Sequence, residues 1–84
     1  MNRNLNKPVA KYILSELLAG NRVAFTKKHP NFSEIDILNQ IVFLKSSLFI
    51  KAELIKNNRS ANNEYTAGIA TSINQSGMTL YNTL

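Results

Sequence analysis

Asn39 and Gln40 are the side chains of this sequence whose chemistry is best suited to recognising DNA bases. They are adjacent polar residues inside a largely apolar run from Glu34 to Ser46. An amide side chain can form two hydrogen bonds at once with adenine in the major groove of DNA. Ser33, directly before the run, adds a hydroxyl group. We therefore predict Ser33, Asn39 and Gln40 as base-reading residues, with a solvated helix face as the alternative interpretation.

Basic side chains are twice as frequent as acidic ones. Ten Lys and Arg against five Asp and Glu give a formal net charge of +5. Such a balance favours a polyanionic partner, and double-stranded DNA is the expected one. The predicted phosphate contacts supply affinity but no sequence information, and an exposed turn or loop tip is the alternative for each of them. These contacts are Lys27, Lys28, Lys51, Lys56 and Arg59.

The residues that catalysis needs do not cluster in this sequence. His29 is the single histidine, there is no cysteine, and the five carboxylates are scattered. A catalytic triad or a thiolate zinc site therefore has no support. We expect no enzymatic activity, no metal and no cofactor. Phe43 and Phe49 could exceed what the core needs, and they would mark an interface if exposed.

Segments that would direct the chain to a membrane are not expected. No apolar run approaches the roughly 20 residues that a membrane span needs, and the first seven residues lack the apolar core of a signal peptide. The absence of cysteine fits a reducing compartment. The sequence therefore predicts a cytoplasmic protein with no membrane partner.

Two helices are predicted to position these residues. Apolar residues at helical spacing predict a helix over 8–19, with Pro8 in its first turn and Gly20 after its end. A second helix is predicted from Glu34 to about Ser46, capped by Ser33 with Asp36 reaching back. Its apolar residues extend beyond one stripe, so it should be deeply buried or packed on two sides. Between the helices, Val23 could form a very short strand, and residues 24–29 a short helix.

The second half of the chain alternates between apolar and polar residues as strands do. Residues 49–56 and 64–70 are predicted to pair as antiparallel strands around the polar loop 57–63. Residues 1–7 are predicted as a flexible basic arm. The uncharged extension 71–84 could form a strand, a short helix, a tail or a dimer contact.

The order of these elements resembles a family of small winged helix-turn-helix proteins common in bacteriophages and prophages. The resemblance rests on Leu17-Leu18-Ala19-Gly20, on Ile41-Val42-Phe43-Leu44-Lys45, and on the strand Ser47-Leu48-Phe49-Ile50-Lys51-Ala52-Glu53. It implies an α+β winged helix-turn-helix fold for residues 8–70, with three short helices followed by a β-hairpin wing. Helix 34–46 would then enter the major groove, and the wing 56–63 would lie on the DNA backbone.

Three functions follow as expectations. The first is a DNA-binding accessory or regulatory protein encoded by a phage or mobile element, with a homodimer supplying two half-sites. The second is a protein-binding module of the same fold that inhibits or redirects a host protein. The third is an architectural factor that bends DNA during recombination. The dependence of duplex binding on salt separates the second from the other two.

Overall fold

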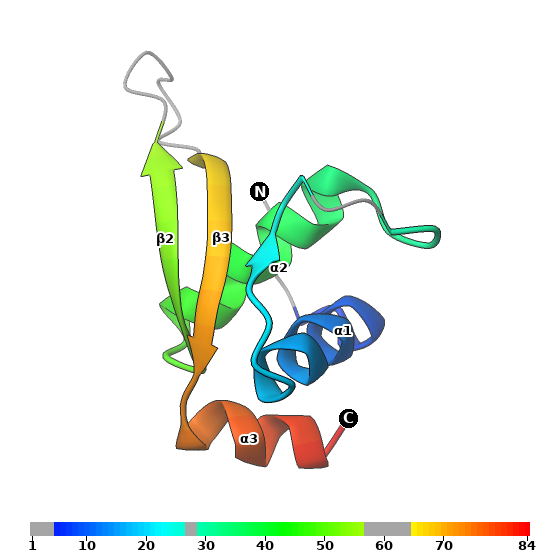
Figure 1. The fold of residues 1–84 in the computed structure, drawn as a ribbon, viewed down its shortest axis with the longest axis vertical. Coiled ribbons are helices and arrows are strands. Elements are labelled where there is room, and N and C mark those ends of the chain that lie inside the picture. The colour runs from blue at the N-terminus through cyan, green and yellow to red at the C-terminus, as the bar shows by residue number, and fades with distance from the viewer. Residues whose placement is uncertain (1–4, 27–28, 57–64) are drawn as a thin grey trace.

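The computed structural model describes residues 5–26, 29–56 and 65–84. The element order is α1 (Lys7–Leu18), β1 (Val23–Ala24), α2 (Glu34–Ser46), β2 (Ile50–Lys56), β3 (Tyr65–Ile73) and α3 (Gln75–Asn82). In Figure 1, α2 runs behind strands β2 and β3, α1 lies beside them, and α3 crosses below the lower end of the sheet.

Helix α1 is the predicted helix 8–19, displaced by one residue at each end. The Asn6 side chain accepts a hydrogen bond from the Val9 backbone N–H and caps the first turn, where Pro8 loses no hydrogen bond. Gly20 follows the helix with φ +87°, a backbone conformation that residues with a Cβ rarely adopt. The predicted start and stop signals are therefore confirmed.

Helix α2 has the predicted bounds, Glu34–Ser46, and the predicted capping box. The Ser33 hydroxyl accepts from the Asp36 N–H at 3.2 Å, and the Asp36 carboxylate accepts from the Ser33 N–H at 3.4 Å. The helix buries six residues, so of the two predicted arrangements, deeply buried or packed on two sides, the first is confirmed. They are Ile37, Leu38, Gln40, Ile41, Val42 and Leu44.

The sheet is antiparallel, with the strand order β1-β3-β2. Strand β2 pairs with β3 from Ile50 opposite Ile73 to Lys56 opposite Tyr65, with irregularities between Lys51 and Ala52 and between Ile55 and Lys56. The predicted pairing of the two long strands is confirmed. Val23 and Ala24 form the short strand that was one of the alternatives, opposite Ala70 and Ile69.

The predicted fold of three short helices followed by a β-hairpin wing is wrong. Of the segment predicted as a short helix, residues 24–29, those that the structure describes contain no helix. Instead the Phe25 N–H donates to the Gly68 carbonyl at 3.0 Å, which continues the pairing of β1 with β3. A third helix follows the strands, because residues 71–84 complete β3 and then form α3. The fold is thus α+β with a three-stranded sheet, and residues 57–63 of the predicted wing lie outside the described residues.

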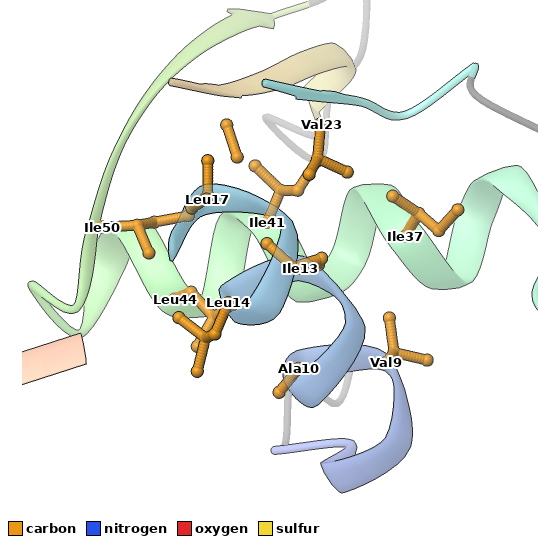
Figure 2. Close-up of a cluster of buried hydrophobic side chains, with 11 residues drawn as sticks. Val9, Ala10, Ile13, Leu14, Leu17, Val23, Ile37, Ile41, Leu44 and Ile50 are labelled. Carbon is orange, nitrogen blue, oxygen red and sulfur yellow. The ribbon is translucent and has the colours of Figure 1, made fainter. Parts of the chain in front are cut away.

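The core lies between α1, α2 and one face of the sheet. Figure 2 shows apolar side chains from both helices meeting those of the strands, among them Ile13 and Leu17 from α1, Ile41 from α2, and Val23 and Ile50 from the strands. The alternation of β2 places Ile50, Ala52 and Leu54 toward this core. Lys51, Glu53 and Ile55 are exposed on the opposite face of the sheet, here called the open face.

Candidate interaction surface

The three predicted base-reading residues do not share an accessible surface. Gln40 is only 2% exposed, and its Oε1 accepts a hydrogen bond from the Asn6 backbone N–H at 2.8 Å. Asn39 is half-buried, and Ser33 is exposed but holds the capping box. Gln40 therefore connects α2 to the start of α1 and would have to leave the core to reach a base.

The exposed first turn of α2 is acidic. Glu34 and Asp36 are both exposed there, with Ile35 between them at 57% exposure. Carboxylates at this end are favourable for the helix dipole, but they repel the phosphates of a DNA backbone. The described surface of α2 is therefore poorly matched to a DNA groove.

Most of the net positive charge belongs to residues whose side chains the structure does not describe. Lys27, Lys28 and Arg59 lie outside the described residues, as does the side chain of Lys56. Among the described side chains, five cations face four carboxylates, so this part of the chain carries +1 of the total +5. Lys51, the remaining predicted phosphate contact, is exposed on the open face with Glu53 two residues further along. The phosphate contacts therefore stay predictions.

The predicted interface residues Phe43 and Phe49 are half-buried and pack against the core. The large apolar side chains that are exposed among the described residues are different ones. They are Leu18, Ile35, Leu48, Ile55 and Met78, of which Leu48 is the most exposed at 75%. The alternation of β2 already placed Ile55 opposite the core-facing residues, whereas no pattern in the sequence singled out Leu48.

Leu48 has a backbone conformation that is unusual for its residue type. It is the one described residue other than glycine with a positive φ, +63°. The Leu48 N–H donates to the Lys45 carbonyl at 3.0 Å, and the Phe49 N–H donates to the Leu44 carbonyl at 2.9 Å. This pair of bonds is the Schellman arrangement that ends many helices, and glycine is the residue it usually contains at this position.

Asn74 fixes this turn against helix α3. Its Nδ2 donates to the Leu48 carbonyl at 2.6 Å, while its Oδ1 accepts from the Gly77 N–H at 2.8 Å and caps α3. The Asn74 N–H also donates to the Phe49 carbonyl at 3.3 Å. The backbone at Leu48 is thus held in place by the element that follows the sheet.

Next to this turn, Phe49 and α3 line an open hollow. Its lining combines apolar side chains with hydroxyl and amide groups. The lining residues are Phe49, Gln75, Ser76, Thr79, Leu80 and Thr83. No residue from Tyr65 to Leu84 is charged. We call Leu48 together with this hollow the Leu48 corner.

A second hollow lies on the sheet. Apolar residues from all three strands line it together with Phe25 and Thr26, and Glu53 is the one charged lining residue. The other lining residues are Ala24, Ile55, Ala67, Gly68 and Ile69. This surface offers contact area but no concentration of charge.

The described residues contain no arrangement suited to metal chemistry. No group of three or more His, Asp or Glu side chains gathers within residues 5–26, 29–56 and 65–84. His29 packs instead among aromatic rings, 4.6 Å from the Tyr12 ring centroid and 4.4 Å from that of Phe32, and its Nδ1 accepts from the Asn31 N–H at 3.1 Å. These contacts explain the presence of His29 by its packing against the two aromatic rings.

None of the helices in the described part of the chain has the length and apolar character required to cross a membrane.

Comparison with known proteins adds no assignment. No protein-family model matches the chain. The searches of curated proteins and of solved structures likewise find no match. The functional argument therefore rests on the geometry of the residues described above.

Proposed function

We propose that this chain is a protein-binding module that contacts its partner through the Leu48 corner. The observation that supports this proposal is that Leu48 combines a left-handed backbone conformation with a side chain that is 75% exposed. A residue with a Cβ pays roughly 1–2 kcal/mol for that conformation. Because the side chain is exposed, burial within the chain offsets little of this free-energy cost. We therefore expect the Leu48 side chain to be buried, and to stabilise, in a complex with a partner.

The surroundings of Leu48 define the kind of partner. The neighbouring hollow is lined by apolar Phe49 and Leu80 and by the hydroxyl residues Ser76, Thr79 and Thr83. The two threonine hydroxyls donate to backbone carbonyls within the helix, so towards a partner they offer acceptor oxygens. Apolar side chains enter such hollows while hydroxyl groups bond the partner's backbone at the edge. The proposed partner is therefore a protein that presents an uncharged, apolar side chain to the corner.

Alanine substitution of Leu48, with Ile35 as a matched control, tests this proposal. Ile35 is also exposed, but it lies at the opposite end of α2. Wild type and I35A are expected to capture the same protein from a lysate of the source organism, and L48A is expected to lose it. With the purified partner, L48A should raise Kd at least about tenfold, as residues central to an interface do. Equal capture by all three proteins would contradict the proposal.

The net charge favours DNA binding as a second candidate function. The excess of +5 would act through phosphate contacts of Lys27, Lys28, Lys56 and Arg59, rather than through base reading by Gln40. Fluorescence anisotropy with a labelled duplex at about 50 and about 200 mM salt tests it, because releasing counterions makes such binding steeply dependent on salt. Binding that weakens steeply with salt, and weakens further in K56A/R59A, would support this candidate. The absence of binding at low salt would exclude it.

A further inference from the structure

The two outer edges of the sheet differ in length. Strand β3 is central, and β1 and β2 form the edges. The β1 edge is two residues long, whereas β2 runs for seven residues from Ile50 to Lys56. In Figure 1, β2 is the outermost strand on its side, and no strand among the described residues lies beyond it. Short edges resist pairing with another chain, so β2 is the edge that can accept a further strand.

Hydrogen-bond geometry identifies the backbone groups that face outward from β2. The Phe25 N–H bonds the Gly68 carbonyl, so the backbone groups of Gly68 face β1. Since the N–H and C=O of one residue in an antiparallel strand point to the same side, Gly68 is not hydrogen-bonded to Leu54, which lies opposite it. The register is regular from Ala52 to Ile55. Leu54 and Ala52 therefore direct their N–H and C=O groups away from β3. Ile50 does the same, because the irregularity next to Ala52 places its extra residue, Thr71, in β3 and leaves the alternation of β2 intact.

A second copy of β2 fits this edge in one antiparallel register. When the two-fold axis passes through Ala52, the backbone of Ala52 hydrogen-bonds to Ala52 of the other copy. The backbone of Ile50 then hydrogen-bonds to Leu54 of the other copy. The same register places Lys51 opposite Glu53 of the other copy, twice across the axis. These are the closely spaced pairs that lack backbone bonds, in which facing side chains are nearest to each other.

The neighbouring registers that satisfy the backbone are electrostatically worse. An axis through Glu53 places the Glu53 side chains of the two copies opposite each other. An axis through Lys51 places the two Lys51 side chains opposite each other. Like charges directly opposite are destabilising, and opposite charges are stabilising. An axis through Leu54 leaves Glu53 opposite Ile55. Charge complementarity therefore selects the register centred on Ala52.

We propose that the chain forms a homodimer by antiparallel pairing of the two β2 edges about Ala52, which yields a continuous six-stranded sheet. Because the two-fold axis is perpendicular to the sheet, both helical layers lie on one face and both open faces on the other. Half-buried Leu54 gains contact with Ile50 of the other copy. This inference does not depend on the Leu48 corner, which is formed by Leu48, Phe49 and residues of α3 and its end rather than by the β2 edge.

Charge reversal tests the register. Sedimentation equilibrium of the full chain should show a species of twice 9.4 kDa at high concentration. K51E and E53K, which each place like charges opposite each other, should raise the dimer Kd at least about tenfold. The double variant K51E/E53K should restore dimerisation. An equimolar mixture of K51E and E53K should also dimerise, because each copy then faces the opposite charge.

A backbone substitution tests the edge itself. Ala52→Pro removes an N–H that points away from β3, so the folded monomer should persist, as judged by circular dichroism, while the dimer is lost. A protein that stays monomeric at millimolar concentration would overturn the proposal. A dimer whose Kd is unchanged by both single charge reversals would overturn it as well, and that result does not require Ala52→Pro to fold.

Discussion

The side-chain amide of Asn74 joins the backbone of Leu48 to helix α3. Its Nδ2 donates to the Leu48 carbonyl at 2.6 Å, and its Oδ1 accepts from the Gly77 N–H at 2.8 Å. If the Asn74 amide were flipped, its Oδ1 would face the carbonyl oxygen of Leu48. The two hydrogen bonds therefore define the orientation of the amide. One side chain thus stabilises both the turn that carries Leu48 and the helix that forms the hollow beside it.

Substitution of Asn74 by alanine should destabilise the fold by about 1–3 kcal/mol, since it removes a helix cap and a second hydrogen bond. Asn74→Ser retains a capping hydroxyl but loses the bond to Leu48, so it should cost less. Urea unfolding of the two variants measures the difference. Equal stability of wild type and Asn74→Ala would show that the amide does not join these elements.

Gly77 should tolerate no side chain. A Cβ at this position would meet the Phe49 carbonyl oxygen and would lie 2.7 Å from Cγ1 of Ile73. We expect Gly77→Ala to cost about 1–3 kcal/mol, the range seen for overpacked sites, by pushing α3 away from the turn before β2. Ser76→Ala, at the exposed neighbouring position, is the matched control and should change the free energy of unfolding by less than about 0.5 kcal/mol. Thermal denaturation that is the same for both variants would contradict this packing.

Gln40 should behave as a structural residue. Gln40→Ala removes the acceptor of the Asn6 N–H and leaves a void in the core, which should cost about 1–3 kcal/mol. Asn39→Ala, one residue earlier and half-buried, should cost less than about 0.5 kcal/mol. Urea titration of both variants checks this. The reverse order of stability would indicate that Asn39, and not Gln40, connects the helices.

Local signals in the sequence predicted the two long helices and the two long strands. Ser33 with Asp36, and Pro8 with Gly20, are start and stop signals that depend on a few neighbouring residues. The pairing of β2 with β3 follows from their alternation. These features could be predicted because the physical cause lies within each segment.

The features that were mispredicted or left open depend on contacts between distant segments. Phe25 bonds to Gly68 and extends β1, so the short helix predicted there does not form in the described residues. Gln40 was predicted on a polar face, although a helix so rich in apolar residues has little exposed surface, and its partner Asn6 is 34 residues away. The positive φ of Leu48 occurs in a turn whose carbonyl is bonded by Asn74, 26 residues away.

The measurement that tests the account of Leu48 most directly is the free energy of unfolding of Leu48→Gly. Glycine removes the free-energy cost of the left-handed conformation, roughly 1–2 kcal/mol. Its greater conformational entropy in the unfolded chain offsets part of this stabilisation. We predict that Leu48→Gly is more stable than wild type by about 0.5–1 kcal/mol, and that Leu48→Ala stays within about 0.5 kcal/mol of it. Destabilisation of both variants by more than about 1 kcal/mol would contradict the account, because it would show that the Leu48 side chain stabilises the isolated fold rather than a complex.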